Sequence, residues 1–212
     1  MLNPKSVLSS VGRNVVILSA CQALGSSGIP LVILAGGIVG ADLAPASTWA
    51  TLPIALAVVG TAVFTIPAAL VMKRIGRKRS FIIAATVATV AALMAAFAIT
   101  AQSFLIFCTM MVLLGGSTAF VQQYRFAAAE SVEHLYVGRA ISFVLVGGIV
   151  AGFLGPEIGR DARDWLGHGA YSGSFVVLAI LYAFSVFLLL FMRDTAARKD
   201  NNTGTERPLS II

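Results

Sequence analysis

Long runs of apolar residues without a charged side chain dominate the pattern of the chain. Such runs occupy residues 14–41 and 43–72, and a third covers 80–124 with a polar break at 100–103. About 20 apolar residues cross the hydrocarbon core of a bilayer as a helix, so the first two runs predict one helix each and the third predicts two. We therefore expect an all-α polytopic membrane protein with six transmembrane helices, at about 15–39, 48–72, 80–99, 104–127, 139–159 and 172–192.

Polar segments flank this six-helix transmembrane domain, which extends over residues 14–192. Residues 1–13 precede it and a polar tail, 193–212, follows it. A cleaved signal peptide is the alternative interpretation of the first run. Its apolar core would measure about 7–15 residues, and the first run is about twice that long, so we predict a retained helix.

The composition supports a membrane protein and excludes a large soluble catalytic domain. Hydrophobic residues make up 58% of the chain and charged residues 11%, whereas soluble domains have about half apolar and about 25% charged residues. Two cysteines, Cys21 and Cys108, lie inside apolar runs and are too few for a disulfide framework.

The distribution of the net charge of +6 predicts the orientation of the chain. Thirteen of its 15 Lys and Arg residues fall on one side of the predicted membrane, and Arg160 and Arg163 fall on the other. Because basic loops stay in the cytoplasm, both termini are expected there. The charge therefore requires no nucleic-acid partner, and the lipid bilayer is the expected environment.

A short basic turn joins the second and third predicted helices. A glycine inside a charged turn allows two helices to reverse direction closely. The alternative is a simple topology anchor that contacts anionic lipid headgroups. The residues of this turn are Arg74, Gly76, Arg77, Lys78 and Arg79.

Polar and sulfur-containing residues recur at helical spacing in the first and fourth predicted helices. Residues three or four positions apart share a helix face, and polar residues inside a membrane helix typically line a cavity. Hydrogen bonding between helices is the alternative. The candidate cavity-lining residues are Ser19, Gln22, Ser26, Cys108, Met111, Thr118, Gln122 and Arg125, with Pro30 as a bend in the first helix.

Two narrower hypotheses concern metal and proton chemistry. Thiolate and thioether sulfur suit Cu(I), and Cys108 and Met111 share a face, but methionine in an apolar helix usually packs. No metal site or cofactor is therefore predicted. A proton relay and solvated ion pairs are the alternatives for the charged cluster near the fourth and fifth helices, which consists of Arg125, Glu130, Glu133, His134 and Arg139.

The fifth predicted helix carries small residues at four-residue spacing. Pairs at 148 and 152, and at 155 and 159, permit close approach of another helix, and a proline bends the helix. Pure packing is the alternative to a functional motif. The residues are Gly148, Gly152, Gly155, Pro156 and Gly159.

These motifs resemble the major facilitator superfamily of secondary transporters. Its loop between the second and third helices has the form Gly-x-x-x-Asp-Arg-x-Gly-Arg-Arg/Lys, which the basic turn follows from Arg74 onward. Ala69 and Lys73 depart from this form at the first glycine and at the acid. In the family the acid helps to latch two halves together, so the lysine puts that latch in doubt. Gly-Pro-x-x-Gly at 155–159 is similar to a fifth-helix motif of exporters, but the partial match implies no direction of transport.

The resemblance implies the N-terminal six-helix half of such a transporter, built as a 3+3 inverted repeat. The second and fifth helices would then correspond, with Gly60 and Pro67 in one and Gly148 and Pro156 in the other. The first and fourth helices would line the path, and the third and sixth would face outward. The segment 122–130 also resembles a bacterial branch of the superfamily that includes CcoA-like copper importers.

The function implied by the resemblance is transport of a small solute by alternating access in the bacterial inner membrane. It requires a missing C-terminal half or a homodimer partner, and the tail would be a truncated interhalf linker. A non-transporting fragment or structural membrane protein is the alternative. An enzyme is not predicted, because His134 and His168 lie in loops and the chain contains no Gly-x-Ser-x-Gly or His-Glu-x-x-His motif.

Overall fold

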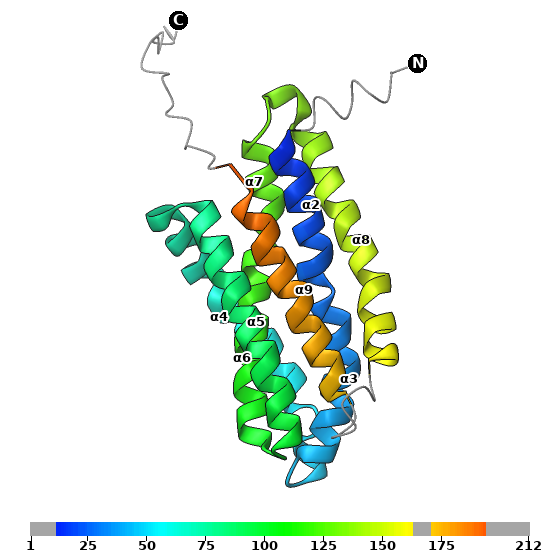
Figure 1. The fold of residues 1–212 in the computed structure, drawn as a ribbon. Helices are drawn as coiled ribbons and strands as arrows, with labels where there is room; N and C mark the ends of the chain where they lie inside the picture. Colours follow the sequence, from blue (N-terminus) through cyan, green and yellow to red (C-terminus); the bar gives the residue numbers. More distant parts are fainter. Residues whose placement is uncertain (1–11, 163–170, 194–212) are drawn as a thin grey trace, which may run out of the picture.

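The computed structural model describes residues 12–162 and 171–193 as a bundle of helices (Figure 1). In this part of the chain the regular secondary structure is entirely helical, and six helical spans are long and apolar enough to cross a membrane. The predicted all-α membrane fold is thereby confirmed. The elements are α2 (Arg13–Ser26), α3 (Gly28–Leu43), η1 (Ser47–Trp49), α4 (Leu52–Ile75), α5 (Arg77–Thr100), α6 (Phe104–Val121), α7 (Tyr124–Glu130), η2 (His134–Tyr136), α8 (Val137–Asp161) and α9 (Ser172–Leu190).

The first membrane span is interrupted between α2 and α3. Pro30 explains the interruption, because proline has no N–H to donate to the carbonyl of Ser26 and its ring crowds that carbonyl. The Ser27 hydroxyl at the break donates to the Leu24 carbonyl at 2.6 Å. The predicted bend is therefore a discontinuity, and it lies three residues before the proline.

The fourth span is also interrupted, between α6 and α7. Gln122 and Gln123 form the break, where the Gln123 N–H donates to the carbonyl of Phe120 at 3.0 Å. A bond to the third preceding residue tightens the turn relative to an α-helix. Unlike the first break, this one contains neither proline nor glycine.

A single residue connects α4 to α5. Gly76 has φ of 87° and ψ of 159°, a backbone conformation that favours glycine. Its N–H donates to the Met72 carbonyl at 3.1 Å, and its own carbonyl accepts the Ser80 hydroxyl at 2.7 Å. The sharp reversal predicted for the basic turn thus has a specific backbone cause.

Three helix pairs pack extensively: α4 with α6, α5 with α9, and α2 with α8. The six spans in order are α2–α3, α4, α5, α6–α7, α8 and α9. If the first, second and third spans are matched to the fourth, fifth and sixth, the α4–α6 pair corresponds to the α8–α2 pair, and the α5–α9 pair corresponds to itself. This is the pattern of an inverted repeat. Glycine permits both related contacts, because a Cβ on Gly60 would strike the Val112 carbonyl and one on Gly147 would strike the Ser19 carbonyl.

The beginning of α2 and the end of α9 are tied together at one end of the bundle (Figure 1). Arg13 donates to the carbonyl of Phe191 at 2.9 Å. Asn14 donates to the Arg193 carbonyl and accepts from its N–H, each at 3.0 Å. The first membrane span therefore begins on the side where the last one ends.

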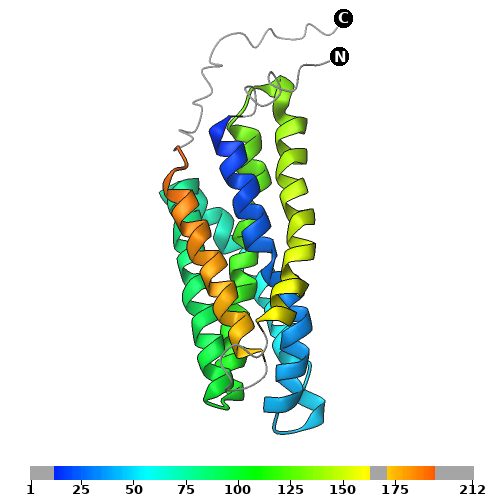
Figure 2. The same cartoon turned by 45° about the vertical axis from the view of Figure 1, so that its right-hand side comes forward.

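Burial within the described half-bundle differs among the spans. In their most apolar windows, α5 and α9 bury 50% and 44% of their residues, whereas α4 and α8 bury 11% and 24%. Figure 2 shows α9 lying along α5. Closely spaced alanines permit this contact, including Ala88, Ala92 and Ala95, which are buried on α5. The most exposed apolar faces thus belong to α4 and α8.

Candidate functional site

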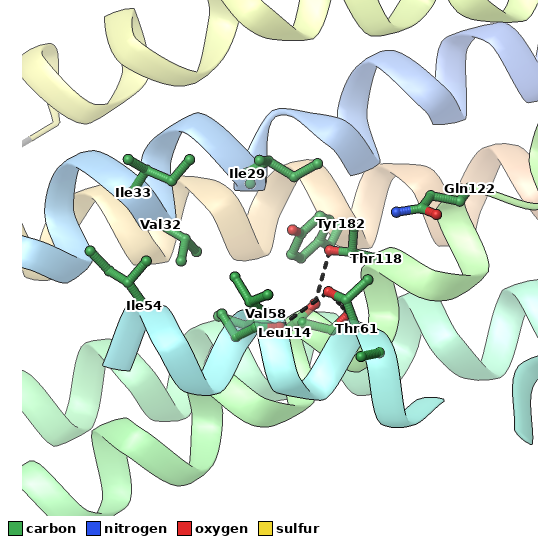
Figure 3. A pocket seen from close by; sticks show the side chains of 14 residues that line it. Ile29, Val32, Ile33, Ile54, Val58, Thr61, Leu114, Thr118, Gln122 and Tyr182 are labelled. Carbon is green, nitrogen blue, oxygen red and sulfur yellow. Dashed lines mark hydrogen bonds between the residues drawn. The ribbon is translucent and has the colours of Figure 1, made fainter. Parts of the chain in front are cut away.

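A pocket of about 400 Å³ opens among α3, α4, α6 and α9 (Figure 3). It lies beside both helix breaks, since Gly28 begins α3 and Gln122 follows α6. Non-helical backbone at membrane depth is tolerated where it lines a cavity or is buried in protein. The lining residues are Gly28, Ile29, Val32, Ile33, Ile54, Ala57, Val58, Thr61, Ala62, Leu114, Gly115, Thr118, Gln122 and Tyr182.

Aliphatic side chains form most of the pocket wall. Figure 3 shows Ile29 and Ile33 of α3 on one side, with Ile54 and Val58 of α4 on the other. Val58 is 66% exposed and Ile33 is 59% exposed, so the pocket is open where these two residues lie. Walls of this kind bind the apolar faces of a ligand, and a few polar groups orient it.

Two threonines of the pocket donate their hydroxyl protons to backbone carbonyls. Thr61 on α4 donates to the Gly115 carbonyl at 2.9 Å, and it also lies 3.1 Å from the carbonyl of Ala57. Thr118 on α6 donates to the Leu114 carbonyl at 3.2 Å. Because a hydroxyl carries one proton, these threonines present oxygen acceptors to the cavity.

Tyr182 and Gln122 complete the polar lining. Neither side chain has a hydrogen-bond partner among the residues that the structure describes. Tyr182 is 4% exposed, and its hydroxyl lies against Gly28 at the first helix break. Sequence reasoning assigned no role to the sixth span, although a tyrosine in the middle of an aliphatic run was a signal that could have identified this residue.

The fourth-helix stripe divides between the pocket and the core. Thr118 and Gln122 line the pocket as expected. Cys108 and Met111 are 5% and 0% exposed and lie outside the pocket lining. Among the described residues, moreover, no cluster of three His, Cys, Asp or Glu side chains suits a metal ion. These observations give the copper hypothesis no geometric support.

The first-helix stripe lies against neighbouring helices rather than in the pocket. The Ser19 hydroxyl donates to the Phe143 carbonyl of α8 at 2.9 Å. Gln22 donates to the Ser26 hydroxyl at 2.7 Å within α2. Hydrogen bonding between helices, the alternative considered for this stripe, describes Ser19, whereas Gln22 and Ser26 bond to each other within α2.

Arg125 lies one turn beyond Gln122, on α7. Its Nε is buried and has no hydrogen-bond partner in the described part of the chain, and its guanidinium lies 5.0 Å from the Phe126 ring centroid. The neighbouring Glu130 pairs with Arg77 of the basic turn. Among the described residues, the Glu130 carboxylate is thus paired with Arg77 and not with Arg125.

The salt bridge between Arg77 and Glu130 joins the start of α5 to the end of α7. Arg77 is the partly buried member, with 23% of its side chain exposed against 55% for Glu130. Arg74 and Arg79 are exposed, and Lys78 is partly buried. Among the described residues, the basic turn thus combines one ion pair with several cations that have no ion-pair partner.

The expected glycines of α8 differ in how closely other helices approach them. A Cβ on Gly148 would have only the Gln22 side chain nearby, and one on Gly152 would meet no described atom within 4 Å. Gly155, one of the expected glycines, does have close neighbours, since a Cβ there would strike Pro30 of α3. The other close contact falls on Gly147, which was not among them, where a Cβ would strike Ser19 of α2. The α-helix continues through Pro156. The surroundings of Gly159 lie outside the described part of the structure, as do residues 1–11 and 194–212 of the predicted termini.

Comparisons with known proteins support one family. The family model described as Major Facilitator Superfamily matches residues 15–212. The riboflavin transporter RfnT of Brucella anthropi is 41% identical over 202 residues, which cover 94% of this chain and 51% of that protein. The uncharacterized MFS-type transporter YdeG of Bacillus subtilis is 21% identical over 193 residues, or 90% of this chain and 45% of that protein.

Both relatives are longer than this chain. The chain spans about half the length of the curated relatives it matches, at 51% and 45%. No solved structure gives a significant match.

Proposed function

Because the chain belongs to the major facilitator superfamily, we propose that it forms one six-helix half of a membrane transporter whose substrate path includes the pocket. The observation that carries the proposal is the position of the pocket between two interrupted spans. Discontinuous helices form the substrate sites of many secondary transporters, at the interface between structural repeats. Thr118 and Gln122 are the sequence candidates that this site includes.

The proposed substrate is riboflavin or a related flat heteroaromatic compound. The name of the Brucella anthropi relative, which is 41% identical, supports this choice. The chemistry of the pocket supports it independently, because aliphatic walls suit the faces of a ring system and a few polar groups suit its hydrogen-bonding edge. A volume of about 400 Å³ lies within the usual range of ligand pockets.

A second half or a second copy of the chain is the proposed partner. The relatives are about twice as long, and the exposed faces of α4 and α8 provide apolar surface for a second bundle. Val58, Ile66 and Phe153 are examples, with 66%, 72% and 75% exposure. In a two-half assembly, rocking of one half against the other gives alternating access to a central site.

The start of α2 and the end of α9 are proposed to face the cytoplasm of a bacterial inner membrane. The tie between the start of α2 and the end of α9 supports their common side. The excess of basic residues at that end supports the cytoplasmic assignment.

The basic turn is proposed to control the movement of the half-bundle. Arg77 ties α5 to α7 through Glu130, while Arg74, Lys78 and Arg79 remain available to the partner half or to anionic lipid. Lys73 replaces the acid of the family motif. The contact between halves that the acid supplies elsewhere therefore has to come from another residue in this protein.

Uptake in riboflavin-requiring bacteria tests the function. Cells that cannot synthesise riboflavin should accumulate it from dilute medium when they express the chain, either alone or with a complementary six-helix half. Ala62→Phe, which fills the pocket, should abolish uptake. Ile83→Phe adds the same ring at an exposed position of α5 outside the pocket and should preserve uptake.

The assembly is tested by the mass of the purified protein in detergent. A dimer that supports uptake identifies a half-transporter that works as two copies. Uptake that appears only with the complementary half identifies a chain that needs a second half. Absence of uptake in both arrangements would contradict the transporter proposal and favour the non-transporting alternative.

A further inference from the structure

We propose that Tyr182 binds the substrate, by donating its hydroxyl proton to the hydrogen-bonding edge of a flat heteroaromatic ring held in the pocket. The inference rests on the proposed function and adds a specificity-determining residue from the sixth span. It is based on two observations: the Tyr182 hydroxyl lies at the first helix break, in the space beside Gly28 that we call its seat, and few other hydrogen-bond donors surround the pocket.

Packing fixes the position of the Tyr182 side chain. The Tyr182 ring belongs to the apolar core formed with Leu178, Leu114 and Leu31. Its hydroxyl occupies the space that the missing side chain of Gly28 leaves at the start of α3. A tyrosine packed at both its ring and its tip presents the hydroxyl at one place in the pocket, and this preorganisation favours binding.

Few hydrogen-bond donors of the pocket are available to a ligand. The protons of Thr61 and Thr118 are directed to helix carbonyls. Tyr182 and Gln122 retain uncommitted protons within the described part of the chain. Figure 3 shows Gln122 extending toward the centre of the pocket, where Thr118 and Tyr182 lie. A ligand that contributes acceptors here satisfies groups that the protein leaves unpaired.

The chemistry of the pocket matches that of a flavin ring. A flavin ring has apolar faces and carries carbonyl oxygens and ring nitrogens along one edge. The aliphatic walls formed by Ile29, Leu114 and Val58 suit the faces. Tyr182 lies among these apolar groups, so its hydroxyl is placed to bond the edge of the ring. Gln122 offers both a donor and an acceptor, which complements the alternation of carbonyls and N–H on that edge.

A binding titration with matched variants tests the inference. The wild-type chain, purified in detergent, is titrated with riboflavin and with lumiflavin, which has the same ring but lacks the ribityl chain. Loss of flavin fluorescence reports binding. Tyr182→Phe should raise the Kd about three- to tenfold for both ligands, the usual value of one neutral hydrogen bond. Tyr124→Phe removes a buried hydroxyl outside the pocket lining and should leave both Kd values unchanged.

Each outcome separates the inference from the proposed function. Wild-type binding with an unchanged Kd in Tyr182→Phe would overturn the inference and leave the transporter proposal standing. A change for riboflavin but not for lumiflavin would also overturn it, because the hydroxyl would then bind the ribityl chain. Failure of the wild type to bind either flavin would overturn the proposed substrate, and the inference with it.

The seat of the hydroxyl supplies a second test. Gly28→Ala places a methyl group where the hydroxyl lies, so it should also weaken flavin binding. Gly37→Ala on the same helix brings only ordinary contact with Ile54 at 3.5 Å and is the control. In a Tyr182→Phe background, Gly28→Ala should have a smaller effect, since the displaced group is absent. Equal effects in both backgrounds would contradict the proposed seat.

Discussion

Unpaired polar groups are concentrated around the helix breaks. A buried donor without a partner costs about 1–3 kcal/mol relative to a satisfied one. Within the described residues, the Arg125 Nε and the Ser185 hydroxyl are buried in this condition, and the Tyr182 hydroxyl also has no partner. Stability alone does not favour such groups. Of the three, only Tyr182 lines the pocket, so its hydroxyl is the one placed to bind a ligand.

Gln122 provides the residue-scale prediction. Gln122→Leu keeps the approximate size of the side chain but removes its donor and acceptor, and it should raise the KM for riboflavin uptake about three- to tenfold. Gln123→Leu changes the neighbouring glutamine, which does not line the pocket. Initial uptake rates over a range of riboflavin concentrations measure the effect. Equal KM values for the two variants would contradict a specific role of Gln122.

Helix existence was predictable from the chain, whereas helix breaks and packing register were only partly so. Apolar runs identify six spans because the bilayer sets a minimum length. Pro30 marks the first break, but Gln122 and Gln123 form the second without a residue that disfavours helix. The four-residue spacing of glycines on α8 allowed several faces. Contact with α2 selects Gly147, and that choice depends on the position of another helix.

The register of α8 gives an element-scale prediction. A methyl group on Gly147 would strike the Ser19 carbonyl, so Gly147→Ala should destabilise the bundle by about 1–3 kcal/mol, as overpacking usually does. Gly152→Ala meets nothing within 4 Å in the described bundle and should be neutral or slightly stabilising, since alanine favours helix. Thermal unfolding of both variants in detergent measures the difference. A lower Tm for Gly152→Ala than for Gly147→Ala would contradict the assigned register.

The connection between α5 and α7 gives a second prediction at this scale. Glu130→Gln removes the partner of Arg77. Because the pair is partly exposed, its loss should change Tm little. It should nevertheless slow uptake if the tie couples the two helices during transport. The exchanged pair Arg77→Glu with Glu130→Arg should recover part of the rate. Uptake by Glu130→Gln at the wild-type rate would exclude this coupling role.

At the scale of the whole molecule, the pocket depends on the assembly of four helices from distant parts of the chain. Spacing within one helix pointed to Thr118 and Gln122, and both line the pocket of the structure. It did not predict Tyr182, because α9 joins the pocket only through its packing against α5 and α2. It also pointed to Ser19, whose hydroxyl donates to the Phe143 carbonyl of α8, a partner that spacing within one helix does not reveal. Faces of single helices are encoded locally, but their neighbours are set by the three-dimensional arrangement.

The orientation of the bundle in the membrane gives the last prediction. In a chain with Cys21 and Cys108 replaced, Trp49→Cys and Arg79→Cys place single thiols at exposed positions near opposite ends of α4. A membrane-impermeant maleimide added to spheroplasts should label Trp49→Cys at once. Arg79→Cys should react only after the membrane is opened, because the basic turn is expected in the cytoplasm. Uptake assays on both variants confirm folding. Labelling of Arg79→Cys in intact spheroplasts would invert the topology, and the salt-bridged basic turn would then act on the outer side of the membrane.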